Sequence, residues 1–253
     1  MRRRFFVDSF GPGTTALRGQ AAHHLGRVLR AEQGQVYELS DGQTVWLGRV
    51  ERVGKNDVEF TLVEQLAAQA PRLCITLALS VVKFDRFEWC LEKATELGVS
   101  EIVPLAAGRS EKSLVAAASK RAERWRKILL ESAQQARRLR APSLGKAVTP
   151  GEWYASLAAS APAGCKIAAG STQGECRLLL SERPGAFSLK RMLDQRIAIA
   201  CVLAIGPEGG WTEEEFALAM RAGFQEASLG ANILRTETAV IAALAAIHFA
   251  LAE

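Results

Sequence analysis

The sequence is poor in the residues that build metal sites and disulfide frameworks. It has only three histidines in 253 residues, and its five cysteines include no CxxC pair. Zinc sites and disulfide frameworks show regular spacing, which an odd number of scattered cysteines does not provide. We therefore expect reduced, mostly buried thiols and no metal site. The cysteines are Cys74, Cys90, Cys165, Cys176 and Cys201.

Long hydrophobic runs are also absent. The apolar run Ile197–Ile205 is far shorter than the roughly 20 residues that a membrane-spanning helix needs. Near the N-terminus, Asp8 follows a basic start before the apolar core of a signal peptide can form. With 49% hydrophobic and 23% charged residues, the composition is that of a globular protein. We expect a cytoplasmic protein that does not bind membranes.

Positive charge is concentrated in one part of the chain. Residues 109–146 contain 11 basic and 3 acidic side chains, a net charge of +8, whereas the whole chain carries +5. Within this segment, Trp125, Leu129 and Ala133 recur at helical spacing, which predicts a helix over about Lys120–Arg138 with an exposed basic face. A solvated helix face is the ordinary explanation. The concentration of charge favours a polyanion such as nucleic acid.

The pattern of apolar residues changes near Ala67–Pro71, where the composition is that of a linker. Before this boundary, short alternating runs are joined by turn sequences such as Asp41-Gly42, which predicts a small β barrel or meander over residues 1–70. The expected elements are a short helix at His23–Leu29 and strands at Val36–Leu39, Thr44–Val53 and Val58–Val63.

From residue 71 onward, apolar strands alternate with amphipathic helices, which is the pattern of a parallel α/β sheet covered on both faces. We expect one domain over residues 71–253. The expected strands are Cys74–Val82, Glu101–Leu105, Lys166–Ala169, Arg177–Leu180 and Ile197–Ile205, and the helices are Phe84–Leu97, the basic segment and Thr238–Leu251.

One loop after a predicted strand, Gly206–Trp211, is rich in glycine. Parallel sheets bind ligands beyond the carboxyl ends of their strands, so this loop is a candidate binding site. Thr212 and Glu215 predict a capping box at the start of the next helix. The loop lacks the spacing of a dinucleotide or Walker motif, and the glutamates at 213–215 would repel a phosphate. A tight structural turn is the alternative.

A second loop, Ala227–Ala239, leads into a helix that is almost wholly apolar. Such a helix must be packed on most of its sides, either within the domain or against a second subunit. Arg235 and Glu237 lie beside it and are costly there unless they are paired or used in chemistry. A structural ion pair between them is the alternative to a catalytic role.

Both loops resemble the signatures of a known enzyme family. IGPEGGWTEEE (Ile205–Glu215) and SLGANILRTETA (Ser228–Ala239) are similar to motifs of the bacterial 16S ribosomal RNA uridine N3-methyltransferases, which belong to the SPOUT class of S-adenosylmethionine-dependent enzymes. Three other stretches agree in order, so the resemblance covers nearly the whole chain. They are HHLGRVLRAEQGQ (His23–Gln35), DRFEWCLEKATELGVSEIVPL (Asp85–Leu105) and RWRKILLESAQQARR (Arg124–Arg138).

The resemblance implies an N-terminal PUA-like β barrel that binds RNA, over residues 1–70. Residues 71–253 would form the SPOUT methyltransferase domain, an α/β fold with a parallel sheet and a deep trefoil knot. The resemblance further implies a homodimer, S-adenosylmethionine as cofactor, and a decoding-region uridine of 16S rRNA in the small ribosomal subunit as substrate. The alternatives are a non-catalytic rRNA-binding or ribosome-assembly factor, and a methyltransferase for another RNA nucleotide.

The family motifs also imply site residues. Uridine N3 becomes a nucleophile when its proton leaves, and Arg235 is the first choice to stabilise the resulting charge, with Arg109 as the second candidate. Glu237 or Glu208 would accept the proton or orient Arg235. The cofactor residues would be Leu180, Ile205, Gly206, Gly209, Gly210, Leu229, Gly230, Ile233 and Leu234, and the RNA contacts Arg2, Arg3, Arg4, Arg86, Arg124, Arg137 and Arg138.

The sequence departs from the common family pattern at two places. After the second strand of the C-terminal domain, Ser-Glu-Arg-Ser is frequent in the family, whereas this chain has Ala107-Gly108-Arg109-Ser110. The arginine and the serine are kept, but the acid is missing. Trp211 stands where phenylalanine is usual.

Overall fold

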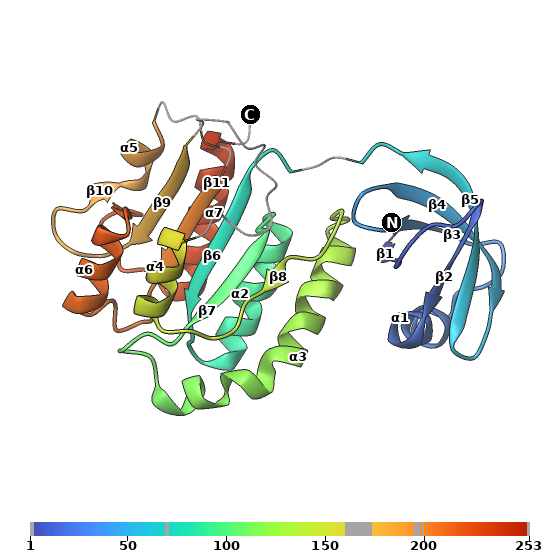
Figure 1. Ribbon diagram of the computed structural model, residues 1–253, viewed down its shortest axis with the longest axis horizontal. Coiled ribbons are helices and arrows are strands. Elements are labelled where there is room, and N and C mark those ends of the chain that lie inside the picture. The colour runs from blue at the N-terminus through green and yellow to red at the C-terminus, as the bar shows by residue number, and fades with distance from the viewer. Residues whose placement is uncertain (1–2, 69–70, 160–173, 195–197, 199, 252–253) are drawn as a thin grey trace. The chain divides into compact units, whose positions relative to one another are not determined.

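The computed structural model describes residues 3–68, 71–159, 174–194, 198 and 200–251 (Figure 1). Arg2, Ile197 and the strand predicted at Lys166–Ala169 lie outside these residues. The chain divides into two compact units. Unit 1 consists of residues 1–70 and 131–141, and unit 2 consists of residues 71–130 and 142–253.

Unit 1 is built on a curled five-stranded sheet in the order β1-β3-β4-β5-β2. β1 pairs with β3 in parallel, the other neighbours are antiparallel, and two register shifts between β4 and β5 bend the sheet. The predicted strands of this region are confirmed, and β1 and β2 were not predicted. The strands are β1 (Arg4–Phe6), β2 (Thr14–Arg18), β3 (Val36–Ser40), β4 (Val45–Val53) and β5 (Asp57–Leu66).

A short helical segment packs against this sheet. α1 (Gly19–His23) continues into a π-helical turn, η1 (His24–Val28). The helical segment therefore begins at Gly19, four residues earlier than the predicted helix. Leu25 of η1 is fully buried and joins Phe5 and Phe60 in the core of unit 1. The helical segment therefore closes the inner side of the curled sheet.

Unit 2 contains a seven-stranded sheet in the order β10-β12-β9-β11-β6-β7-β8, and all its neighbouring strands are parallel. The central strands β6 and β11 are fully buried, as their continuous apolar sequences predict. The strands are β6 (Cys74–Ser80), β7 (Glu101–Leu105), β8 (Ser143–Leu144), β9 (Glu175–Leu180), β10 (Phe187–Ser188), β11 (Ala200–Ile205) and β12 (Gln225–Ser228).

Helices cover both faces of this sheet (Figure 1). Alternate residues of β6 and β11 point to two separate apolar clusters, one on each face. The first cluster includes residues of α2 (Phe84–Glu96), α3 (Lys112–Gln135), α5 (Leu189–Leu193) and α7 (Thr236–Leu251), and the second includes residues of α4 (Pro150–Ala159) and α6 (Glu213–Arg221). The predicted parallel α/β architecture is confirmed, although α4, α5 and three short strands were not predicted.

The basic helix ends earlier than predicted. α3 stops at Gln135, and Arg137 has a left-handed backbone with φ of 52°. An ion pair of 3.5 Å joins the Arg137 guanidinium to Glu38 of β3. The Ser40 hydroxyl donates a hydrogen bond of 2.7 Å to the carbonyl oxygen of Leu139. The prediction that Arg137 lies on the helix was therefore wrong, because this stretch contacts the sheet of unit 1, although the Arg137 side chain is exposed as expected.

The apolar last helix buries only one of its faces within the chain. Val240, Leu244 and Ile247 are fully buried, but the side chain of Phe249 is 83% exposed and Ala245 is also exposed. The expectation that this helix is packed on most sides is not met within a single chain.

One cysteine prediction needs correction. Cys74 is disulfide-bonded, so the expectation of reduced thiols throughout was wrong. Cys90 of α2 is a buried free thiol, as predicted.

Within the described residues, no helix is long and apolar enough to cross a membrane. The same residues contain no group of three or more His, Cys, Asp or Glu side chains that could hold a metal ion.

Candidate active site

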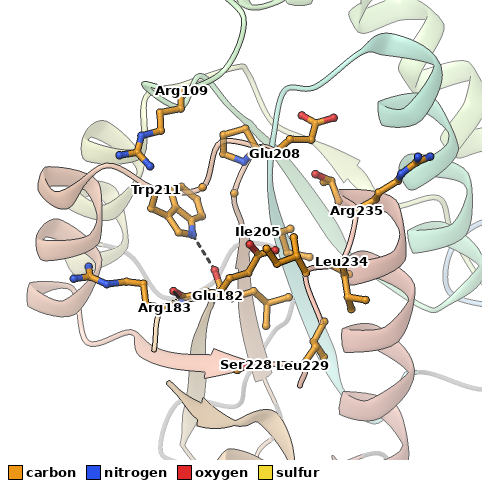
Figure 2. Close-up of a pocket in the computed structure, with 18 of the residues that line it drawn as sticks. Arg109, Glu182, Arg183, Ile205, Glu208, Trp211, Ser228, Leu229, Leu234 and Arg235 are labelled. Atoms are coloured by element: carbon orange, nitrogen blue, oxygen red, sulfur yellow. Dashed lines mark hydrogen bonds between the residues drawn. The ribbon is translucent and has the colours of Figure 1, made fainter. Parts of the chain in front are cut away.

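Three loops meet at the carboxyl edge of the unit 2 sheet. β12, β9 and β11 are neighbours in the sheet, so the loops after Ser228, Leu180 and Ile205 begin side by side. They surround a cavity of about 540 Å³ (Figure 2). This volume and this position at the strand ends are both typical of small-ligand sites in α/β folds.

The cavity brings together residues from both loop motifs that the sequence singled out, Ile205–Glu215 and Ser228–Ala239. Of the predicted catalytic residues, Arg109, Glu208 and Arg235 line it, whereas Glu237 does not. Gly209 is the one predicted cofactor residue outside the lining. The predicted cofactor residues in the lining are Leu180, Ile205, Gly206, Gly210, Leu229, Gly230, Ile233 and Leu234.

Glycines shape the loop after β11. A Cβ atom on Gly206 would lie 3.1 Å from the indole ring of Trp211, so glycine allows this ring to lie against the backbone. Gly210 has a φ of 70°, which strains any residue with a side chain. The glycine-rich sequence is therefore required for the shape of the loop itself.

Trp211 joins two of the cavity loops. Its indole nitrogen donates a hydrogen bond of 3.0 Å to the carbonyl oxygen of Leu180, drawn as a dashed line in Figure 2. The tryptophan is 9% exposed, and the contact spans 31 residues of sequence. A phenylalanine at this position has no such donor.

A fourth loop, which follows β7, reaches the same site. The Arg109 guanidinium donates a hydrogen bond of 2.8 Å to the carbonyl oxygen of Gly209. The Gly108 amide donates one of 2.7 Å to the Glu215 carboxylate. Glu215 also forms the predicted capping box with Thr212 at the start of α6. Residues far apart in the sequence are thus joined on one side of the cavity.

Arg235 stands at the opposite side of the cavity from Arg109 (Figure 2). Its side chain is exposed, and none of the described residues accepts a hydrogen bond from its guanidinium. It forms no ion pair with Glu237, so the structural alternative for these two residues is wrong. The donors of Arg235 are available to a ligand.

The two candidate acids are held in different ways. The carboxylate of Glu208 forms an ion pair of 2.9 Å with Arg86, a residue predicted to contact RNA. Glu237 has a buried carboxylate oxygen without a hydrogen-bond partner among the described residues. Burial raises the pKa of Cys90 to about 12, and the charge of Glu237 adds to this increase. The Glu237 carboxylate is therefore near enough to Cys90 of α2 for its charge to act on this thiol, and it forms no ion pair with Arg235.

The loop after β9 contributes charged residues that the sequence did not single out. Glu182 and Arg183 line the cavity. The Arg183 guanidinium pairs with Glu213 at 3.1 Å and lies 4.2 Å from the centre of the Phe216 ring. Because this loop also follows a predicted strand, the same argument about carboxyl ends would have identified it.

Several predicted RNA contacts are engaged within the protein. Arg4 is largely buried and pairs with Glu38 at 2.9 Å, and Arg124 pairs with Glu88 at 2.8 Å. Arg3 lies 3.3 Å from the His24 ring nitrogen. Burial lowers the pKa of Arg138 to about 10, with a further contribution from the charge of Arg140. The exposed cations of α3 among the described residues are Lys112, Lys120, Arg124, Arg126 and Lys127.

Comparison with known proteins connects this site to a family. Residues 69–248 match the RNA methyltransferase domain family, and residues 17–63 match the PUA domain of RNA methyltransferases. The chain is 33% identical to the ribosomal RNA small subunit methyltransferase E of Synechocystis sp. over 239 residues, which cover 93% of this chain and 73% of that protein.

Solved structures give the same result. The fold is similar to the ribosomal RNA small subunit methyltransferase E of Neisseria gonorrhoeae bound to S-adenosyl methionine, with a TM-score of 0.83 and 30% identity over 99% of this chain and 98% of that one. A methyltransferase of Legionella pneumophila in complex with the same compound has a TM-score of 0.81 and 29% identity, over 100% and 99% of the two chains.

Proposed function

The chain belongs to the RNA methyltransferase family that includes the ribosomal RNA small subunit methyltransferases E, and from this membership we propose that it methylates N3 of a decoding-region uridine in 16S rRNA. The family and the fold class predicted from the sequence are confirmed by the comparisons. The methyl donor is S-adenosylmethionine, the compound bound by the relative from Neisseria gonorrhoeae.

The cavity fits this cofactor in size and chemistry. Its volume of about 540 Å³ suits a nucleoside joined to an amino acid. Ile205, Leu229 and Leu234 provide apolar walls for an adenine ring, and the glycine-rich backbone leaves amide and carbonyl groups accessible to its polar edge. The observation that carries the proposal is that both motif loops, which α6 and β12 separate in the sequence, enclose one cavity at the strand ends.

The chemistry needs a stabilised anion beside the methyl donor. When bound, S-adenosylmethionine supplies a methyl group on a positively charged sulfur. Uridine N3 attacks this carbon once its own proton has left, and the negative charge spreads over N3, O2 and O4. Arg235 has a planar set of donors, lines the cavity and is unpaired among the described residues. We therefore assign to Arg235 the stabilisation of this negative charge on the uridine.

The proton from N3 needs an acceptor close to the cavity. Glu208 lines the cavity and Glu237 does not, which favours Glu208. The ion pair with Arg86 restricts the Glu208 carboxylate to one side of the site. The proton passes from N3 to this carboxylate and from there to solvent. The N3–carbon bond then forms as the sulfur–carbon bond breaks, and the demethylated cofactor leaves.

The exposed face of α7 supports the homodimer that the family resemblance implies. Phe249 is 83% exposed, and Trp89 of the neighbouring helix α2 is 42% exposed. Exposed large apolar side chains on helices that pack together are found at many subunit interfaces. We therefore propose that a second copy of the chain binds this face.

We further propose that residues 1–70 and the basic segment bind rRNA. The enzyme would then work in the cytoplasm, where its ribosomal substrate is found.

Two measurements test the proposal. Calorimetry with S-adenosylmethionine should show binding, because a non-catalytic rRNA-binding or assembly factor has no need of the cofactor. Mass-spectrometric mapping of 16S rRNA from a strain lacking the protein should show the loss of one N3-methyluridine, restored by the wild-type gene. Loss of a methyl group at another nucleotide would overturn the proposed target while leaving the methyltransferase activity.

A further inference from the structure

A buried carboxylate at the start of α6 makes one contact more than its helix requires. Glu215 is 8% exposed, and one of its oxygens accepts a hydrogen bond of 2.9 Å from the Thr212 amide. That contact, with the bond from the Glu215 amide to the Thr212 hydroxyl, completes the capping box. The other oxygen accepts the Gly108 amide at 2.7 Å, from a different loop.

The loop that receives this contact lies close against the capping box. A Cβ atom on Gly108 would lie 3.3 Å from the Thr212 side chain and 3.6 Å from the Glu215 carboxylate. The next residue, Arg109, is held at its other end by the 2.8 Å hydrogen bond to the Gly209 carbonyl oxygen. The dipeptide Gly108-Arg109 is thus held at one end by the start of α6 and at the other by the loop that follows β11.

The charge of Glu215 is what makes both contacts possible. A carboxylate accepts hydrogen bonds at both of its oxygens, and the N-terminus of a helix favours its negative charge. An amide group of the same shape has only one acceptor, so it would leave either Thr212 or Gly108 unpaired. Residues 107–110 contain no acid of their own that takes over this role.

We propose that Glu215 is a positioning residue that holds the loop 107–110 so that the Arg109 guanidinium stays at the rim of the cofactor cavity during methyl transfer. The inference rests on the proposed methyltransferase function. Arg109 lines the same cavity as Arg235, so a displacement of its loop alters the site in which the methyl group is transferred. Glu215 acts on the reaction only through this loop.

A matched control separates this role from helix capping. Glu152 occupies the same position in α4, where its carboxylate accepts the Thr149 amide at 2.9 Å and the Thr149 hydroxyl at 2.8 Å. Among the described residues, its carboxylate accepts hydrogen bonds from Thr149 alone, and it does not line the cavity. Glu152→Gln therefore weakens a helix cap in the same way as Glu215→Gln, without releasing Gly108.

The experiment compares steady-state kinetics of these variants on rRNA. We expect Glu215→Gln to lower kcat about tenfold or more, because small displacements of a catalytic group are costly, with Glu152→Gln close to wild type. In an Arg109→Ala background, Glu215→Gln should cause no further loss of kcat. Equal kcat for the two glutamine variants, or independent effects of Glu215 and Arg109, would overturn the proposal.

Two additions keep the test decisive. Gly108→Ala pushes the loop away from the capping box without altering the cap, so it should lower kcat even if Glu215→Gln folds poorly. Hydrogen exchange over residues 106–111 should accelerate in Glu215→Gln but not in Glu152→Gln. This measurement does not depend on activity, so unchanged hydrogen exchange in Glu215→Gln contradicts the positioning role. The proposed function fails separately, if the wild-type protein methylates no rRNA.

Discussion

The indole nitrogen of Trp211 donates a hydrogen bond to the Leu180 carbonyl oxygen, and this bond joins the loops that follow β11 and β9 on one side of the cavity. Trp211→Phe removes it and leaves a buried carbonyl without its donor. A loss of about 1 kcal/mol in cofactor binding, roughly fivefold in Kd, is expected for one such bond. Calorimetry with S-adenosylmethionine measures this change.

Trp125→Phe is the control for that variant. The Trp125 indole nitrogen is buried and has no hydrogen-bond partner among the described residues, and its ring packs against Phe87 in the core. This substitution should lower the melting temperature and leave the Kd for the cofactor unchanged. If Trp211→Phe binds the cofactor as tightly as wild type, the bond to Leu180 does not support the site.

Arg235→Ala should abolish most of the methyl transfer without affecting the fold. The side chain is exposed and has no partner to lose among the described residues. Removal of a donor that stabilises a transition-state anion costs about a hundredfold in kcat. Arg235→Lys should be intermediate, since a lysine lacks the planar set of donors.

Single-turnover methylation of rRNA is the measurement for Arg235, with circular dichroism to verify the fold. Arg221→Ala serves as the control, because Arg221 is exposed at the end of α6 and does not line the cavity. Near-normal methylation by Arg235→Ala would show that another group, such as Arg109, carries the anion.

The basic face of α3 should bind rRNA phosphates through its exposed cations. Reversing Arg137 would place a carboxylate beside Glu38 and damage unit 1, so Lys120→Glu with Arg126→Glu is the better test. Each lost phosphate contact reduces the salt dependence of binding by about 0.7 in a plot of log K against log salt. The double variant should therefore bind more weakly, with a slope smaller by about 1.4.

Lys190→Glu with Arg221→Glu changes the net charge equally but outside α3. Filter binding or fluorescence anisotropy at several salt concentrations compares the two double variants. An identical slope in both would mean that the face of α3 is merely solvated.

Much of the fold could be predicted because its signals are local. The capping box of Thr212 and Glu215 lies within four residues, and β7 was predicted with its observed bounds at Glu101–Leu105. The end of α3 could not be predicted, because it depends on Arg137 meeting Glu38, almost a hundred residues earlier in the chain. Apolar spacing continues past this point, but the contact with β3 decides where the helix stops.

The candidate site shows the same division. Sequence motifs identified Arg109, Arg235 and Glu208, because the chemistry needs those residue types beside glycine-rich loops. They did not reveal that Glu208 pairs with Arg86, 122 residues away. The sequence shows that both charged residues are present, but it does not show that they form an ion pair. The trefoil knot stays a prediction of the family resemblance.

Stability should depend on pH through the turn between β3 and β4. Burial tends to raise the pKa of Asp41, but hydrogen bonds from the amides of Thr44 and Gln43 and from the Thr44 hydroxyl outweigh it, and the net pKa is lowered. The carboxylate therefore stabilises the fold at pH values above its unfolded pKa of about 3.9. This stabilisation is lost as the pH falls through the lower folded pKa.

Asp41→Ala should accordingly destabilise the protein by about 1 kcal/mol at neutral pH, with a difference from wild type that shrinks in acid. Urea unfolding at pH 7 and near pH 3 measures both values. Asp41→Asn keeps an acceptor without a titrating charge, so it isolates the part that depends on pH. A constant difference between wild type and Asp41→Asn across this range would contradict the assignment.

The exposed face of α7 predicts self-association. Phe249 is 83% exposed on a helix that is almost wholly apolar after Thr238, and burying a side chain of this size in an interface contributes about 2 kcal/mol. Phe249→Glu should convert a dimer into a monomer in sedimentation velocity, with an unchanged fold, because no contact within the chain is lost. Val63→Glu, on an exposed position of β5, is the control that should remain dimeric. A wild-type protein that sediments as a monomer would leave the apolar face unexplained by a second copy, and a dimer that survives Phe249→Glu would move the interface away from α7.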